Sequence, residues 1–380
     1  MKKQLLLRIC AVSAISILAF SCKKDASPTQ KGLSVSKSDF AASTLTTDNV
    51  YVSGFYFNSG NDYARYWFNT TTLVPLTAGT PASNGDANDI DVSSSGDVYT
   101  IGQKNTSITN DGVVWKNTTI YSLPNPSGFT GPFVTPRMVY ANGNDIYIVG
   151  ESYFSGSDHR ATLWKIPGGN MAALTVQSLS TTSNTDAYGV TVTTAGDVYI
   201  SGTVGTTAGG NACYWKISGG VTTGPTTLPG PVAGGQPQIV SISNDVYIGF
   251  TVYPNSIYLY KNGAVYTPGL TGTPLNSAIN LSLATHGSDL YMSVLGTNNP
   301  STTIGTVFYW NVTSAPTTAH TFTDASYCAT RKGCLAVGAS GDVYIAGDYS
   351  SPATGCVWKN GVVTSLYAGA GNTITGISVK

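Results

Sequence analysis

The sequence predicts an all-β fold, a seven-bladed β-propeller with four antiparallel strands in each blade. A motif of the form GDVYTIG returns seven times along the 380 residues, which indicates a repeat architecture. An aromatic residue, six times Trp and once Tyr, follows each copy of the motif. Four short strand-like runs with turn residues between them fill each unit, and this is typical of a propeller blade. The motif tyrosines are Tyr51, Tyr99, Tyr147, Tyr199, Tyr247, Tyr291 and Tyr344, and the later aromatic residues are Trp67, Trp115, Trp164, Trp215, Tyr260, Trp310 and Trp358.

Residues 89–123 show the order of elements inside one unit. The four runs read DIDVSS, DVYTIG, GVVWKN and TIYSL, so the repeated motif is the second strand of its blade. Asp or Asn beside Gly predicts the tight turn before that strand, and its alternating Val, Tyr and Ile are expected to pack between adjacent blades. The KNG tripeptides at 261–263 and 359–361 predict hairpin turns after the third strand.

The two ends of the repeat region predict that the ring is closed. The first unit begins at DNVYVSG without a convincing strand before it, and TITGISVK at 373–380 is a strand without a blade of its own. We therefore expect the C-terminal strand to complete the first blade. Closure of this kind hides strand edges that an open array exposes.

The repeated acidic and aromatic residues are interpreted as scaffold. The six motif aspartates lie beside Gly, Asn or Ser, and Asp side chains in such places hydrogen-bond the turn backbone. A ring of metal ligands or catalytic carboxylates is the alternative. The repeated tryptophans are expected to anchor the core and not to form a sugar-binding ladder. The six aspartates are Asp97, Asp145, Asp197, Asp245, Asp289 and Asp342.

The first 47 residues are expected to lie outside the propeller. Residues 1–21 have the basic start and the apolar stretch of a signal peptide, residues 22–47 read as a flexible tether, and residues 48–380 form the propeller. LAFSC at 18–22 resembles a bacterial lipobox, and this resemblance implies lipidation of Cys22 and attachment to a membrane. The alternative is a soluble secreted protein that is cut elsewhere in this region.

Charge and cysteine content narrow the class further. Loss of Lys2, Lys3 and Arg8 with the leader leaves 16 basic and 19 acidic residues, and nothing clusters as the basic face that a nucleic-acid binder needs. Cys328 and Cys334 in CATRKGC are close enough for a disulfide in an oxidising compartment. Cys213 and Cys356 are expected in the core. No zinc-like spacing of Cys and His is found, and neither a metal nor a cofactor is predicted.

The repeats also resemble a known group of proteins. Residues 48–380 are similar to repeat β-propeller lipoproteins of the Bacteroidetes type, in which NDVYVAG-like strands alternate with YWKNG-like strands. The resemblance to kelch propellers is looser, because the diglycine after the strand is missing. The resemblance to the lipoproteins implies an outer-membrane lipoprotein on the periplasmic or cell-surface side, and it implies no activity.

Loop lengths predict which face carries function. The connectors between the second and third strands and those between blades are longer and more variable than the others, and binding residues concentrate on such loops. The segment ESYFSGSDHR supplies Glu151, Tyr153, Asp158, His159 and Arg160. Inter-blade connectors supply Arg137, Asp186 and Arg331, and further polar residues that are candidates for the channel mouth include Asp86, Asn88 and Gln238. The alternative is a solvated loop with an Asp158–Arg160 charge pair and residues that merely cap strands.

The sequence favours a binding module over an enzyme. Once the repeat acids are assigned to the scaffold, few carboxylates and three histidines remain for proton transfer. No nucleophile elbow, P-loop, dinucleotide motif or EF-hand is present. We expect a monomeric, non-catalytic propeller that binds a glycan, a peptide or a membrane protein through its loop-rich face. The alternatives are a carbohydrate-active hydrolase or lyase with its site at the central channel mouth, and a purely structural or adhesive role.

Overall fold

The structure of the chain is a computed structural model. It describes residues 48–58, 61–76, 84–105, 110–155, 158–205, 210–233, 235–252, 256–270, 277–297, 306–322, 334–349, 354–366 and 371–380. All of these belong to one compact unit, Ser43–Lys380. The predicted leader, Cys22 and the tether lie outside the described residues, as do Cys328 and Arg331, so the predictions on them stay predictions. Within the described part, no helix has the length and apolarity needed to cross a membrane.

Antiparallel sheets make up the unit, and the fold is all-β and propeller-like, as the repeats predict. Five of the sheets have four strands in sequence order. They consist of β8 (Val134–Asn142), β9 (Asp145–Ser155), β10 (Asp158–Ile166) and β11 (Thr175–Ser178); β12 (Thr185–Val192), β13 (Val198–Val204), β14 (Asn211–Ser218) and β15 (Val221–Thr227); β16 (Gln238–Ile242), β17 (Asp245–Val252), β18 (Ser256–Lys261) and β19 (Ala264–Val265); β20 (Ser277–His286), β21 (Asp289–Thr297), β22 (Thr306–Asn311) and β23 (Ala315–Phe322); and β24 (Leu335–Val337), β25 (Val343–Tyr349), β26 (Thr354–Lys359) and β27 (Val362–Ser365). Two short 3-10 helices, η1 (Pro167–Gly169) and η2 (Met171–Ala173), lie between β10 and β11.

An eight-stranded sheet contains both ends of the repeat region. Its strands are β28 (Asn372–Val379), β1 (Val50–Asn58), β2 (Asn61–Phe68), β3 (Thr72–Pro75), β4 (Asn84–Val92), β5 (Val98–Asn105), β6 (Asn110–Lys116) and β7 (Thr119–Ser122). The C-terminal strand β28 pairs antiparallel with β1, from Val379 opposite Val50 to Asn372 opposite Tyr56. A single parallel pair, Tyr63 with Gly85, joins β2 to β4.

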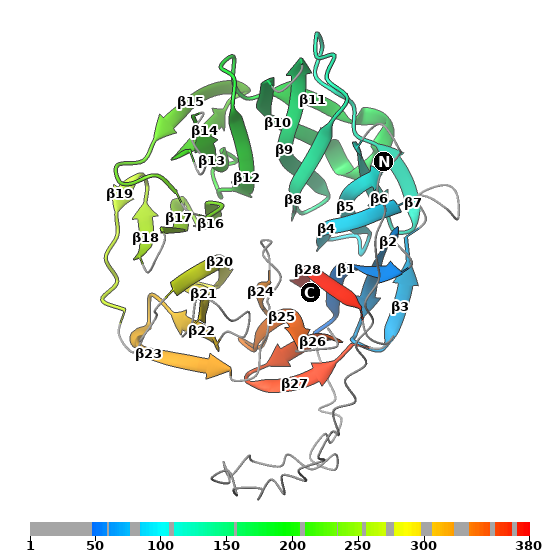
Figure 1. Ribbon diagram of the computed structural model, residues 1–380. Coiled ribbons are helices and arrows are strands. Elements are labelled where there is room, and N and C mark those ends of the chain that lie inside the picture. Colours follow the sequence, from blue (N-terminus) through cyan, green and yellow to red (C-terminus); the bar gives the residue numbers. More distant parts are fainter. Residues whose placement is uncertain are drawn as a thin grey trace, which may run out of the picture. The chain divides into compact units, whose positions relative to one another are not determined.

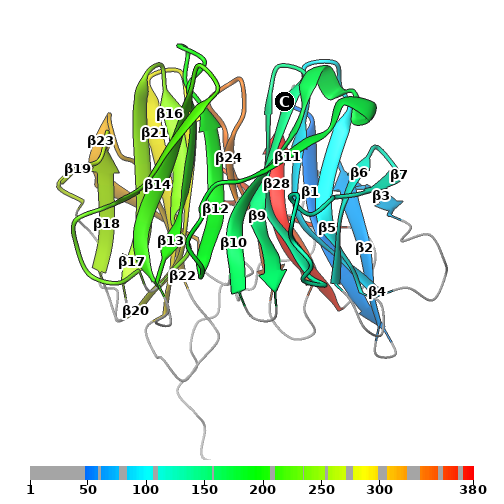
Figure 2. The ribbon, with the colours of Figure 1, turned by 90° about the horizontal axis from the view of Figure 1, so that it is seen from above.

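Figure 1 shows the sheets following one another around a common centre, with β4, β8, β12, β16, β20, β24 and β28 innermost. Each of these inner strands contacts the next, and β28 contacts β4. The strands run between two faces of the unit (Figure 2). We call the face with the turns between first and second strands, such as residues 143–144, the short-turn face. The opposite face, where β9 leads to β10 and one sheet is followed by the next, is the loop face.

The hydrophobic core lies between neighbouring sheets. The described residues form seven core clusters, and each contains one of the repeated aromatic residues. Six clusters draw side chains from two successive sheets, and the seventh, with Trp115, lies inside the eight-stranded sheet, between its β2 and β4–β6 parts. Trp215, for example, packs with Leu163 of the preceding sheet. All the repeated tryptophans are buried, as is Tyr260, which takes the place of Trp in its unit. The prediction that these residues anchor the core is confirmed, and Cys213 and Cys356 are buried with them.

The repeat aspartates are scaffold residues. Asp145 accepts a turn N–H as predicted, from Gly168 at 2.7 Å, but the partner that these aspartates share is a different one. In five sheets the carboxylate binds the lysine that follows the repeated aromatic residue, and that lysine also lies 5.0 to 5.8 Å from the centroid of the motif tyrosine ring. The pairs are Asp97–Lys116 (3.0 Å), Asp145–Lys165 (3.1 Å), Asp197–Lys216 (2.7 Å), Asp245–Lys261 (2.7 Å) and Asp342–Lys359 (2.7 Å). The third strand brings the lysine opposite the motif tyrosine, so cross-strand pairing outweighs the bond to the turn backbone.

The asparagine after that lysine completes the connection. Asn360 donates its amide to Asp342 at 2.6 Å and accepts the backbone N–H of Val343 at 2.8 Å. Asn262 makes the equivalent bonds in its own sheet. Asn262 and Gly263 have φ of 53° and 81°, as a tight hairpin turn requires, so the predicted KNG turns are confirmed. Where Asn follows the lysine, as after Lys116, Lys261 and Lys359, the Asp, Lys and Asn are thus occupied in holding the second strand to the third. Ile takes the place of this Asn after Lys165 and Lys216.

Asp348 is a buried carboxyl group that contacts the C-terminal strand β28. Its carboxylate is 7% exposed and accepts the backbone N–H of Ile374 in β28 at 3.1 Å. Burial raises the pKa of Asp348 to about 7. Since an unfolded Asp loses its proton near pH 4, the folded protein holds an extra proton between about pH 4 and 7, and its stability falls as the pH rises through this window.

The substitution Asp348→Asn keeps the acceptor for Ile374 and removes the titration. We expect the variant to be about 4 kcal/mol more stable than the wild type at pH 8 and nearly equal to it at pH 4. Urea midpoints of both proteins at the two pH values measure this. The same difference at both pH values would show that the carboxyl is not protonated in the folded state.

Candidate functional site

The predicted site residues come together on the loop face, at the ends of β8, β9, β10 and β12. Strand register explains the meeting, because Glu151 of β9 lies opposite Thr135 of β8 and Ala161 of β10. Tyr153 lies opposite His159. Asp186 is the second residue of β12, the inner strand of the next sheet. Residues from three separate segments therefore share one cluster.

Two β-bulges aim side chains into this cluster. Arg137 has no Cα partner in β9, because the register shifts between Pro136 and Met138. Tyr188 occupies the equivalent place in β12. Bulges turn a side chain away from the regular alternation of a strand and are common beside functional sites.

Arg137 and Glu151 form a bidentate ion pair. Arg137 Nε donates to Glu151 Oε2 at 3.0 Å, and Nη2 donates to Oε1 at 2.5 Å. The Glu151 side chain is 5% exposed and the Arg137 side chain 29%. Burial lowers the pKa of Arg137, but the Glu151 carboxylate more than reverses this, so its pKa is raised overall. The sole glutamate of the chain is thus held by a charged partner that reaches solvent.

Asp186 forms a second ion pair beside the first. His159 Nε2 lies 3.3 Å from Asp186 Oδ1, and the Tyr188 hydroxyl donates to Asp186 Oδ2 at 3.3 Å. Burial raises the pKa of Asp186, but the hydrogen bond from His159 and the charges of His159 and Arg137 lower it overall. Burial and the Asp186 carboxylate raise the pKa of Tyr188, so its phenol stays protonated. The Arg137 guanidinium lies 5.9 Å from the Tyr188 ring centroid and links the two pairs.

Aromatic rings border the charges on the β9–β10 side. The Arg160 guanidinium lies 4.1 Å from the centroid of Phe154 and 5.6 Å from that of Phe129. Arg160 also donates to Asp158 at 3.1 Å, the local charge pair that the sequence predicts as the alternative interpretation of this loop. Tyr153 packs against His159, with centroids 5.6 Å apart.

The connector that precedes β8 contributes to this border. Backbone bonds from Thr130 to Phe154 and from Gly131 to Tyr153 tie it to the end of β9. Phe133 meets Tyr153 edge to face at 5.2 Å. We call Arg137, Glu151, His159, Asp186 and Tyr188 the ion-pair cluster, and we call Phe129, Phe133, Tyr153 and Phe154, at or beside the ends of the same strands, its ring border.

Most of the predicted residues belong to this cluster or adjoin it. Asp158 and Arg160 form their pair at its edge, and Asn88 approaches it by donating to the Pro136 carbonyl at 3.1 Å. Gln238 is buried in β16, where it donates to the Gln236 carbonyl. Tyr188 was not predicted. Its signal is its bulge position, which matches that of Arg137 in the preceding unit.

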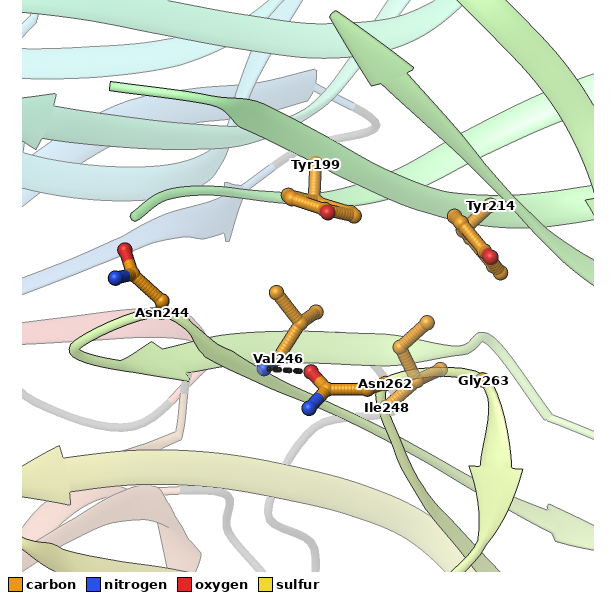
Figure 3. Close-up of a pocket in the computed structure, with 7 residues that line it drawn as sticks. All are labelled: Tyr199, Tyr214, Asn244, Val246, Ile248, Asn262 and Gly263. Atoms are coloured by element: carbon orange, nitrogen blue, oxygen red, sulfur yellow. Dashed lines mark hydrogen bonds between the residues drawn. The ribbon is translucent and has the colours of Figure 1, made fainter. Parts of the chain in front are cut away.

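The short-turn face carries pockets that the sequence does not predict. The pocket in Figure 3 has a volume of about 190 Å³ and lies between the sheet of β12–β15 and the sheet of β16–β19. Its lining residues are Tyr199, Tyr214, Asn244, Val246, Ile248, Asn262 and Gly263. A second pocket, of about 270 Å³, lies at the preceding junction and is lined by residues that include Tyr147, Leu163, Lys165, Val198 and Gly220. Among the described residues, no group of three or more His, Cys, Asp or Glu side chains is placed to hold a metal ion.

Comparisons with known proteins show the fold alone. No protein-family model and no curated protein matches the chain. Among solved structures, a triple arginine-to-alanine mutant of AofleA from Arthrobotrys oligospora is similar at a TM-score of 0.50 and 13% identity, covering 80% of this chain and 94% of that one. A serine-to-alanine mutant of puromycin hydrolase complexed with PGG is similar at a TM-score of 0.54 and 11% identity, covering 85% of this chain and 52% of that one, so the match spans about half of the hydrolase. TolB from Acinetobacter baumannii matches at a TM-score of 0.45 and 10% identity, over 87% of this chain and 82% of TolB.

Proposed function

We propose that the chain is a seven-bladed propeller and that β28 closes its first blade. The eight-stranded sheet divides naturally at the single Tyr63–Gly85 pair into two groups of four strands. With this division, every group has an inner strand that contacts the inner strands on either side, and β28 is the inner strand of β1 to β3. A rigid ring of this kind supports loops that recognise a ligand.

The proposed role is a non-catalytic binding or scaffold module that holds a partner on the loop face. The observation that carries it is that both acids of the ion-pair cluster have a basic partner, Glu151 the guanidinium of Arg137 and Asp186 the imidazole of His159. A general acid needs a pKa near the working pH. The lowered pKa of Asp186 and the raised pKa of Tyr188 move both groups away from that range. The cluster is therefore better suited to recognition than to proton transfer.

A polypeptide segment is the partner that fits the cluster best. Arginine and aromatic side chains supply most of the energy at protein interfaces, and here Arg160 lies on Phe154 and Phe129 beside the two ion pairs. Charges of both signs suit a mixed-charge segment better than a neutral glycan. We further propose that Cys22 carries a lipid that anchors the protein to the outer membrane, on its periplasmic or cell-surface side, so that the partner is an envelope protein.

Substitution of Phe154 tests this surface. The mature protein, fixed through its N-terminus, is used to capture proteins from detergent-solubilised envelopes. We expect it to recover one partner at stoichiometric yield, and Phe154→Ala to recover at least about tenfold less, as for loss of an interface anchor. The matched control is Val265→Ala, since Val265 is 60% exposed in β19 and far from the cluster in the fold. Equal recovery of the partner by both variants would show that the ring border is not part of the binding surface.

The carbohydrate-active alternative predicts a different result. A panel of polysaccharides incubated with the protein would then release reducing ends, and Glu151→Gln or His159→Ala would abolish the release. The binding proposal predicts no release above a blank without protein. Turnover that depends on Glu151 would overturn the non-catalytic role.

A further inference from the structure

Two successive junctions between sheets carry pockets built from the same repeat positions. Tyr147 and Tyr199 are motif tyrosines, and each forms one wall of its pocket. Val198 and Val246, the residues before a motif tyrosine, line the facing side. The hairpin turn after the third strand supplies Gly220 in one pocket and Asn262 with Gly263 in the other. The sheet of β12–β15 thus takes part in both pockets, on the face opposite the ion-pair cluster.

Other junctions in the described part of the fold are occupied differently. At three of them the motif tyrosine or its surroundings meet another segment of the chain. The Tyr99 hydroxyl donates a hydrogen bond to the Gly169 carbonyl at 3.3 Å, and the Tyr344 hydroxyl donates one to the Asp48 carboxylate at 3.0 Å. The Tyr247 ring packs against Tyr266, with centroids 5.9 Å apart. An open pocket is therefore a feature of particular junctions and not a necessary consequence of the repeat.

Two aromatic rings and fixed amides shape the pocket in Figure 3. The rings of Tyr199 and Tyr214 have centroids 6.1 Å apart and face Val246, Ile248 and Asn262 across the space. Asn262 accepts the Val246 N–H at 2.8 Å and donates one of its two amide hydrogens to Asp245 at 2.8 Å, so its second amide hydrogen is the one that can reach a ligand. Asn244 accepts from the Thr194 hydroxyl and the Ala195 N–H, which leaves the two donors of its exposed amide nitrogen toward solvent. Gly263 has no side chain to cover Tyr214, whose hydroxyl would lie 3.4 Å from a Cβ at that position.

The charges beside this pocket are already neutralised. Lys216 binds Asp197 at 2.7 Å, and Lys261 binds Asp245 at 2.7 Å. A ligand in the pocket thus meets aromatic faces, amides and paired charges. This combination favours a neutral molecule over an anion.

We propose that this pocket binds one neutral pyranose ring. Its volume of about 190 Å³ has room for a single sugar ring. The apolar face of a pyranose stacks on the tyrosine rings, as amphipathic aromatic residues allow. Its hydroxyls exchange hydrogen bonds with the Asn244 and Asn262 amides.

The second pocket is a related and weaker site. In this pocket Leu163 occupies the repeat position that Tyr214 has in the first pocket. Both residues pair with the second residue after the motif tyrosine of their own sheet. Leucine contributes apolar area without a ring or a hydroxyl. Two neighbouring sites on one rigid face raise the avidity for a glycan that presents several such rings.

Binding of methyl pyranosides to the full chain tests the proposal. The panel contains neutral hexosides, deoxyhexosides and N-acetylhexosaminides, with a uronic acid as the charged comparison, and saturation-transfer NMR and calorimetry detect the binding. We expect a Kd of about 1 mM for at least one neutral pyranoside, as for a ligand of about a dozen heavy atoms. Tyr214→Ala is expected to weaken it at least about tenfold.

The matched control is Tyr121→Ala, which removes a tyrosine of β7 that is 36% exposed. It is expected to bind as the wild type does, and so is Phe154→Ala on the loop face, so this result is separate from the proposed partner site. A binding constant that Tyr214→Ala leaves unchanged would overturn the proposal. Binding of the uronic acid alone, or of no member of the panel, would overturn it as well.

Discussion

Removal of residues 371–380 is expected to leave a chain without a cooperative unfolding transition. These residues contain β28, which pairs with β1 along the whole strand and buries Ile374 and Ile377. Loss of two such side chains costs about 2–5 kcal/mol each, and the exposed edge of β1 and the lost contacts with β4 add to this. The sum reaches the whole stability of an ordinary domain, about 5–15 kcal/mol. Thermal unfolding followed by circular dichroism measures it.

A permuted chain provides the control. Lys380 and Asn49 exchange backbone hydrogen bonds of 2.8 and 3.0 Å, so a short Asn-Gly linker can join Lys380 to Asp48 as a hairpin. A protein that begins at Gly371 with this linker and ends at residue 370 is expected to unfold within a few degrees of the wild type. If the truncated chain were as stable as the permuted one, the pairing of β28 with β1 would not hold the ring together.

Glu151→Ala is expected to destabilise the protein by about 3–5 kcal/mol. Removal of one partner of a buried ion pair leaves the other charge uncompensated, and Arg137 would lose both of its bonds to Glu151. The matched control is Gln103→Ala, at the same repeat position four residues after a motif tyrosine, where the side chain donates to Val134 and Thr135. Loss of these neutral bonds costs about 1 kcal/mol. Urea unfolding of both variants at pH 7 measures the difference, and equal costs would contradict a buried ion pair.

Replacement of both partners separates stability from recognition. R137M/E151L fills the same space with apolar side chains, and such replacements are often neutral or stabilising. We expect its urea midpoint to return to that of the wild type. A midpoint as low as that of Glu151→Ala would indicate that the surroundings need the charges for folding.

The repeated part of the fold could be predicted from the sequence. Each repeated Trp occupies one core cluster, as Trp164 and Trp215 do between two successive sheets, because the same packing problem recurs at every junction. The partners of the motif aspartates were harder to predict from the sequence. Local turn chemistry points to the backbone, whereas pairing of the second and third strands brings Lys116 to Asp97.

Most members of the ion-pair cluster were predicted from the sequence, but Tyr188 and the geometry of the cluster were not. Loop length and the concentration of titratable residues in one segment indicate Glu151 and His159. The bulges that aim Arg137 and Tyr188 into the cluster have no local sequence signal, because they arise from a register shift between strands. The pockets of the short-turn face escaped prediction for a related reason, since Tyr199 and Asn262 meet only across two sheets.

Recovery of the envelope partner by R137M/E151L decides whether the ion-pair cluster binds that partner, because this variant changes the cluster while the scaffold stays folded. We expect the variant to unfold at the same urea concentration as the wild type and to recover at least about tenfold less partner. Full recovery of the partner by the folded double variant would contradict the proposed binding.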